Sequence, residues 1–237
     1  MRFVYPVFFF FMLLTGCENK HSNPSKNKVI QKKEIDSVQS KKIKESEKPK
    51  VIEEKPLISR ALDSARTFLL DYGKENPETK VVIETSFGDI EIQLYKDTPL
   101  HRANFIFLAK HHYFDNTLFY RVAPDFVVQG GNNDDSETSI KRSRIGEYLL
   151  YPEMRHNHNR GAVSMARYYE DNPRRLSKPY EFFIVIAQKG AHHLDGEHTV
   201  FGRVTKGLEV ADKISMVKAD SQEWPYADIP MKVRVEE

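Results

Sequence analysis

The sequence contains a single cysteine, Cys17, among its 237 residues. An internal disulfide is therefore impossible, and the cysteine content says nothing about the redox state of the compartment. The chain also lacks an apolar run long enough to cross a bilayer, because the run from Phe3 to Leu14 falls short of the roughly 20 residues that a spanning helix needs. Neither sign of charge dominates, with 36 Lys and Arg against 34 Asp and Glu, so we expect no nucleic-acid partner.

The short apolar run has the features of a secretory signal, since it follows the basic start Met1-Arg2. The residues Leu14-Thr15-Gly16-Cys17 then resemble the processing box of bacterial lipoproteins. This resemblance implies that residues 1–16 are a cleaved signal peptide and that Cys17 is lipidated. Several acyl chains on one residue make a stable membrane anchor. We expect a protein anchored in the bacterial cell envelope, outside the cytoplasm; a plain signal peptide with an incidental cysteine is the alternative.

The composition changes sharply after the cysteine. Residues 17–56 are rich in Lys, Glu, Ser and Asn and contain no aromatic residue, which predicts a disordered, charged linker. Residues 57–79 follow as a helical extension, because apolar residues recur at steps of three and four between Leu57 and Tyr72. The apolar stripe of this helix needs a partner, either the following domain or a second copy of the chain.

Residues 80–237 show the period of short strands. Apolar residues alternate with polar ones over 81–85, 90–95 and 231–235, and helical spacing returns near 99–112 and 206–216. Many short strands with two helices indicate a mainly β domain, a closed antiparallel barrel capped by helices. The polar stretch 132–144 is interpreted as a mobile loop.

Three blocks of this domain carry a more specific signal. They are Phe119 to Gly131, in which Arg121 and Gln129 are interleaved with apolar residues, then Gly161 to Ala166, and finally Phe182 to Val204. Alone, the first block fits an ordinary surface hairpin. In this order and at these distances the three resemble the cyclophilin family of peptidyl-prolyl cis–trans isomerases, over about Val81 to Val235. The resemblance implies an eight-stranded closed barrel capped by two helices, to which this chain adds an N-terminal helix and a disordered tether.

The resemblance also implies a site for proline-containing polypeptides. It gives catalytic roles to Arg121, as the cation that stabilises the twisted amide, and to Gln129, which bonds the substrate backbone. The implied substrate-binding residues are Phe126, Val127, Ala166, Arg167, Phe183, Leu194 and His198. Considered alone, Arg121 would fit a surface salt bridge, and Phe126, Phe183 and Leu194 would fit ordinary core. We expect an isomerase that assists folding of exported proteins, a monomer that needs no cofactor.

Three positions depart from the family pattern. Arg167 stands where asparagine is usual, Glu181 where glutamine is common, and His193 where tryptophan is frequent. The carboxylate of Glu181 is in a position to pair with Arg121 or with Arg167, and pairing with Arg121 would weaken catalysis. Two alternatives therefore stay open: a non-catalytic proline-peptide binding module or chaperone, and a purely structural lipoprotein.

The nine histidines raise the question of a metal site. Three groups of them are adjacent or nearly adjacent, but no carboxylate or cysteine completes a recognisable ligand spacing. We therefore expect no metal. Ser164, although a possible nucleophile beside a histidine, has no G-x-S-x-G elbow around it, so the sequence does not favour a hydrolase.

Overall fold

The computed structural model describes residues 55–236, and eight strands of that range form one closed barrel. The order around the barrel is β1-β2-β7-β5-β6-β4-β3-β8, and every neighbouring pair is antiparallel. The expected barrel is therefore confirmed. The strands are β1 (Lys80–Thr85), β2 (Gly88–Leu94), β3 (Thr117–Ala123), β4 (Val127–Asn132), β5 (Ala162–Arg167), β6 (Ser177–Val185), β7 (Val200–Lys206) and β8 (Pro230–Glu236).

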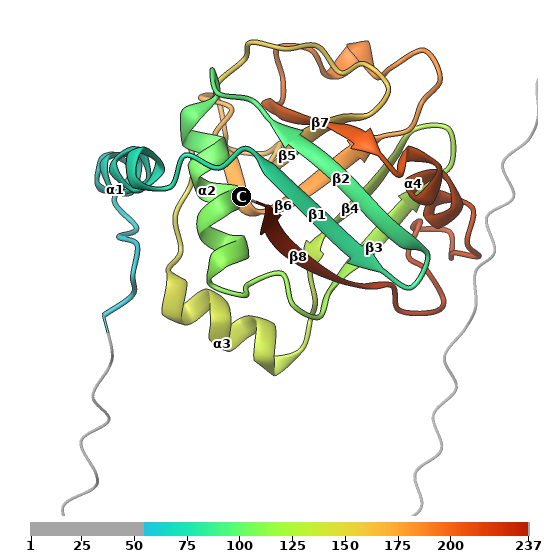
Figure 1. Cartoon of the computed structure of the whole chain (residues 1–237), viewed down its shortest axis with the longest axis horizontal. Helices are drawn as coiled ribbons and strands as arrows, with labels where there is room; N and C mark the ends of the chain where they lie inside the picture. The colour runs from blue at the N-terminus through green and yellow to red at the C-terminus, as the bar shows by residue number, and fades with distance from the viewer. Residues whose placement is uncertain (1–54, 237) are drawn as a thin grey trace, which may run out of the picture. The chain divides into compact units, whose positions relative to one another are not determined.

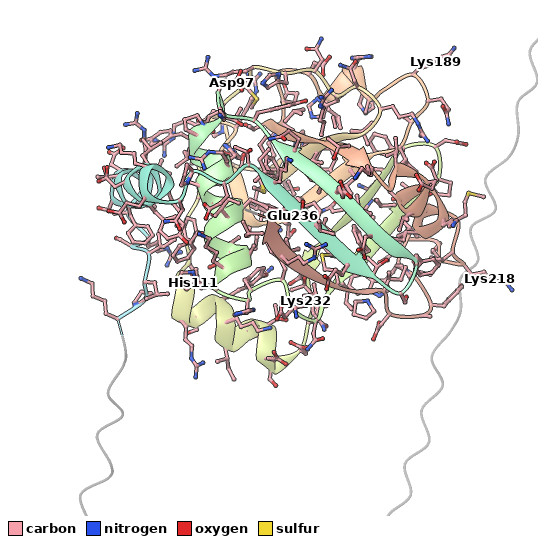
Figure 2. All side chains as sticks on the ribbon, viewed as in Figure 1. Asp97, His111, Lys189, Lys218, Lys232 and Glu236 are labelled. Carbon is pink, nitrogen blue, oxygen red and sulfur yellow. The ribbon has the colours of Figure 1, made fainter. Side chains whose placement is uncertain are left out.

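The barrel encloses the main apolar core. Along β2, Ile90, Ile92 and Leu94 are buried and alternate with more exposed residues, as expected for a strand with one face on a core. Along β8 the exposed positions include the charged residues Lys232 and Arg234, and Figure 2 labels Lys232. Charged side chains such as Lys189 also point away from the protein surface in that view. Apolar residues fill the inside while charges cover the outside, which fixes the register of each strand.

The two expected capping helices are present as α2 (Pro99–Lys110) and α4 (Leu208–Ser215). Figure 1 shows them at opposite ends of the barrel. Pro99 occupies the first turn of α2, where its missing N–H leaves no helical bond unmade. Gly207 is the N-cap of α4 and has φ +79; a Cβ there would lie 2.0 Å from the carbonyl oxygen of Asp89, so only glycine fits.

The N-terminal extension forms α1 (Leu62–Glu75), which begins five residues later than the spacing predicts. Its apolar stripe packs on α2, the first of the two arrangements considered (Figure 1). Ala65 and Leu69 are fully buried there, and Phe68 meets the ring of Phe107 edge to face.

The signal peptide predicted over 1–16, Cys17 and nearly all of the linker predicted over 17–56 lie outside the described residues. Within residues 55–236, no helix has the length and apolar character of a membrane span.

The prediction of a mobile loop over 132–144 is wrong, because most of it folds as α3 (Ser136–Ile145). The carboxylate of Asp135 caps this helix by accepting the Thr138 N–H at 2.7 Å. Glu137 and Lys141 form an i,i+4 ion pair on its surface. Only Thr138 and Ile145 of the helix are buried. A helix with so few buried positions leaves almost no apolar period in the sequence.

Candidate active site

A cavity of about 740 Å³ opens over β3, β4, β5 and β6. Strand alternation places it outside the barrel, since Val128 and Ile184 point into the main core while their neighbours Val127 and Phe183 point the other way. All nine residues predicted for catalysis or substrate binding line it. The lining residues are Arg121, Phe126, Val127, Gln129, Ala166, Arg167, Tyr169, Phe183, His193, Leu194, Glu197 and His198.

The floor of the cavity is apolar. Val127, Phe183 and Leu194 belong to a small buried cluster that is separate from the barrel core, and Phe126 packs against it while remaining half-buried. These side chains are not ordinary core, because their cluster borders an open cavity. The ring of His193 stacks on Phe126 at 5.3 Å between centroids, so a histidine takes part in the cavity wall. The cavity therefore has the apolar lining and the concave form of a small-ligand site.

Arg121, on β3, supplies the cation at the rim. Its Cζ atom lies 5.8 Å from the centroid of the Phe126 ring. Its Nη1 atom is 3.5 Å from Oε1 of Gln129, and its Nε atom donates to the carboxylate of Glu223 at 2.6 Å. Arg121 thus has an ion pair and faces the cavity at the same time. An arginine guanidinium is cationic and offers several donors in one plane.

Gln129, on β4, is oriented by a chain of polar groups. Its Nε2 atom donates to the hydroxyl of Tyr120, and that hydroxyl donates to Glu181 at 2.9 Å. Burial and the nearby Glu181 carboxylate raise the pKa of Tyr120 far above its usual value, so the phenol keeps its proton. The amide nitrogen of Gln129 therefore faces Tyr120 and its oxygen faces Arg121.

Glu181 pairs with neither Arg121 nor Arg167, the two partners that its sequence position left open. Glu181 is 5% exposed and accepts from Lys178 at 2.6 Å, while Nη2 of Arg142 lies 3.5 Å from its other oxygen. Two nearby cations and the Tyr120 hydroxyl satisfy this buried carboxylate, as a buried charge requires. The Glu181 carboxylate therefore does not pair with the cavity cation, Arg121. Arg121 pairs instead with Glu223.

Arg167 lies at the opposite rim and is held in place by Glu197. Its Nη2 atom is 2.6 Å from that carboxylate, which also binds Arg175 at 3.0 Å. The guanidinium stacks over the Tyr169 ring, with Cζ 4.5 Å from the centroid. Arg167 is therefore a fixed part of the wall, and its planar face supports an aromatic side chain.

His198 completes the rim beside Phe183, with the two ring centroids 5.4 Å apart. Its Nδ1 atom is 3.0 Å from the carbonyl oxygen of Met165, and its Nε2 atom is 2.9 Å from the Tyr169 hydroxyl. Nδ1 must carry a proton to bond a carbonyl, so Nε2 accepts from the tyrosine in the neutral ring. Burial lowers the pKa of His198, and repulsion from Arg167 and His158 adds to this effect.

Comparison with known proteins agrees with this geometry. The family model described as cyclophilin type peptidyl-prolyl cis-trans isomerase/CLD matches residues 80–235. The chain belongs to the cyclophilin family. Relatives include peptidyl-prolyl cis-trans isomerase CYP18-2 of Arabidopsis thaliana, 34% identical over 65% of this chain and 92% of its own length. Another is peptidyl-prolyl cis-trans isomerase ppi1 of Schizosaccharomyces pombe, 36% identical over 65% of this chain and 94% of its own length.

The cyclophilin fold is also found among solved structures. A cyclophilin type peptidyl-prolyl cis-trans isomerase of Cryptosporidium parvum has a TM-score of 0.57 and 24% sequence identity, with 68% of this chain and 98% of that chain covered. At this identity the likeness concerns the fold. The matched range of the family model begins at β1, so α1 lies outside it.

Tyr169, Glu197 and Glu223 are the members of this cyclophilin site that sequence reasoning missed. Tyr169 and Glu197 lie close in sequence to predicted residues, and their polar and aromatic character next to Arg167 and His198 was the available signal. Glu223 is 102 residues from Arg121 in sequence. Within the printed sequence nothing distinguishes it from other acidic loop residues, so only the fold brings the pair together.

Ser164 lies in a polar network beneath the cavity. The ring of His158 has Nδ1 2.8 Å from Asp195 and Nε2 3.0 Å from the Ser164 hydroxyl, an order of groups that resembles a hydrolase triad. Ser164 and His158 are fully buried, however, and the hydroxyl also bonds the carbonyl of Thr199 at 3.0 Å. The network therefore supports the cavity floor.

Among residues 55–236, no three His, Cys, Asp or Glu side chains gather as a metal site requires.

Proposed function

We propose that this protein catalyses cis–trans isomerisation of peptidyl-prolyl bonds. The observation that carries the proposal is the guanidinium of Arg121 at the edge of an apolar cavity, with its Cζ atom 5.8 Å from the ring of Phe126. A prolyl ring placed on the apolar floor of Phe183 and Leu194 would bring its amide nitrogen toward this cation. Family membership supports the same activity.

The chemistry needs a site that prefers the twisted amide to the planar one. Resonance gives the C–N bond partial double-bond character and a barrier of about 18–20 kcal/mol. In the twisted state the nitrogen regains its lone pair and becomes a hydrogen-bond acceptor. A fixed cationic donor lowers the energy of that state more than the energy of the planar substrate. Arg121 supplies the donor, and the oriented amide of Gln129 binds the peptide backbone beside the proline.

The proposed substrates are proline-containing segments of exported proteins. The Cryptosporidium parvum relative was crystallised in the presence of the dipeptide Ala-Pro, which supports proline peptides as the ligand class.

The lipoprotein motif ending at Cys17 supports a location in the bacterial cell envelope, with the domain acting as a monomer on an acyl anchor. Labelling with a radioactive fatty acid tests the anchor: wild type should take up label and Cys17→Ser should not. Label on the serine variant would exclude this site.

The activity itself is tested with an Ala-Pro peptide and NMR exchange spectroscopy. Arg121→Ala should lower the isomerisation rate by about 10²-fold, the usual effect of removing one preorganised donor from a transition state. Arg121→Lys should recover only part, because an ammonium lacks the planar fork. Arg234→Ala on β8 is the matched control, since this arginine pairs with Glu84 on the barrel surface and not with the cavity. Equal rates in wild type and Arg121→Ala would disprove the assigned mechanism.

A non-catalytic binding module is the second candidate. The ion pair between Arg121 and Glu223 favours it, because a carboxylate next to the guanidinium offsets part of its charge. Such a module would bind the peptide, with chemical-shift changes at the cavity residues, but would show no exchange between cis and trans signals. The same NMR titration therefore separates the two functions.

A further inference from the structure

Glu223 contacts the cation of the cavity, Arg121, but the proposed mechanism gives it no part. Its carboxylate Oε2 accepts from Nε of Arg121 at 2.6 Å. Nη1 reaches Gln129 at 3.5 Å. Within residues 55–236, these are the hydrogen bonds that the guanidinium makes, and neither of them uses Nη2.

The loop that carries Glu223 is built to hold it there. Asp220 organises the loop, because its carboxylate accepts from the backbone N–H of Gln222 at 2.8 Å and of Trp224 at 3.0 Å. Glu223 itself has φ +66, a conformation that a residue with a side chain adopts only when its surroundings enforce it. The fixed loop therefore sets the direction of the Glu223 side chain.

The same loop is joined to the strand that carries the cation. The backbone N–H of Val122, the residue after Arg121, donates to the carbonyl of Glu223 at 2.8 Å. The ring of Trp224 packs on Tyr120, the residue before Arg121, with centroids 5.6 Å apart. Backbone and side-chain contacts on both sides of Arg121 thus fix the distance between the two charged groups.

Two effects of this carboxylate oppose each other. It withdraws part of the positive charge from the cavity, and it removes rotational freedom from a long side chain. The side chains of Arg121 and Glu223 are 36% and 41% exposed, so water screens their attraction and the loss of field is small. The orientation is not screened, because the hydrogen bond fixes the guanidinium plane. Orientation should therefore dominate.

We infer that Glu223 is a positioning residue that aligns the guanidinium of Arg121 with the twisted prolyl amide. The inference rests on the proposed isomerase function and adds to it a residue that acts through Arg121 without touching the substrate. It applies to the step that crosses the barrier, since the planar amide has less need of an aligned donor.

The experiment compares Glu223→Ala, Glu223→Gln and wild type with an Ala-Pro peptide. Glu223→Ala should lower kcat three- to tenfold and change KM less than twofold, because the lost interaction acts in the transition state. Glu223→Gln keeps an acceptor oxygen without the charge and should retain more than half of kcat. Gln222→Ala is the matched control, since this neighbouring side chain is exposed and should leave both constants unchanged.

A second readout does not depend on catalysis. The ¹H–¹⁵N signal of Arg121 Nε should be protected from solvent exchange in wild type and in Glu223→Gln, and should lose protection in Glu223→Ala. A wild type with a protected Nε–H but no isomerisation would reject the proposed function and still show the alignment. An active Glu223→Ala whose kcat equals or exceeds that of wild type overturns the inference. So does an equal loss in both Glu223 variants, which would assign the effect to charge.

Discussion

The side chain of Gln129 shows how the cavity sets the direction of a neutral polar group. Its amide nitrogen faces a tyrosine hydroxyl that is itself committed to Glu181, and its oxygen faces Arg121. Reversing the amide would place nitrogen against guanidinium and lose both contacts. One hydrogen of the NH₂ group is left for a peptide carbonyl. The buried carboxylate of Glu181 thus acts through Tyr120 to set which atoms of Gln129 face the substrate.

Eight of the nine predicted site residues lie inside one of three sequence blocks that fold next to one another, and Arg167 directly follows the second block. β4 pairs with β6, and β6 with β5, so short local motifs become neighbours across the sheet. Glu223 was missed for the opposite reason. It belongs to a loop outside those blocks, and its contact with Arg121 exists only because the loop is joined to β3. Local sequence patterns predict which side chains adjacent strands contribute to the site. They do not predict which distant loop contacts those strands.

His198 makes stability depend on pH with a definite sign. Burial lowers the pKa of this histidine in the folded protein, whereas an unfolded histidine titrates near about 6.5. The unfolded chain therefore takes up the proton first as the pH falls. The stabilising contribution of the neutral ring is complete above about pH 6.5 and is lost below it, as the pH falls through the folded pKa.

The measurement is the melting temperature between pH 7.5 and pH 5. The wild-type value should fall more steeply with acidification than the value of His198→Gln, which has no titrating ring at this position. His112→Gln is the control, because this side chain is 73% exposed and its removal should leave the wild-type slope unchanged. Parallel slopes for wild type and His198→Gln would show that the ring protonates equally in both states.

At the scale of elements, the helices divide by how much apolar surface they bury. Every residue of α2 from Leu100 to Ala109 is buried, because the helix has the barrel on one side and α1 on the other (Figure 1). Its position could be predicted from sequence spacing and from Pro99. α3 buries two residues and is specified by its ends, with the Asp135 cap at the start and Gly146 at φ +125 after its last residue. Such end signals are short and also occur in turns, so the sequence pattern alone suggested a loop.

At the scale of the whole molecule, the extension before β1 is part of the folded domain. Ile58 is fully buried, and its backbone N–H donates to the carbonyl of Ile145 at the end of α3, at 2.8 Å. On α2, Arg102 donates to the carbonyl of Gly73 at 2.7 Å and to that of Asn76 at 2.8 Å, which joins the end of α1 to the capping helix. The folded unit therefore begins well before residue 80, where the family match starts.

This integration predicts different costs for two leucines of the extension. Leu69 is fully buried against α2, so Leu69→Ala should lower the free energy of unfolding by about 2–5 kcal/mol, the range for a buried leucine. Leu57 is 53% exposed, and Leu57→Ala should cost less than about 0.5 kcal/mol. Urea unfolding followed by fluorescence measures both. Affinity for a proline peptide should be unchanged in either variant, because the cavity lies over β3 to β6 and neither leucine lines it. Equal unfolding midpoints for Leu69→Ala and wild type would mean that α1 adds nothing to the domain in solution, and the functional unit would then begin at β1.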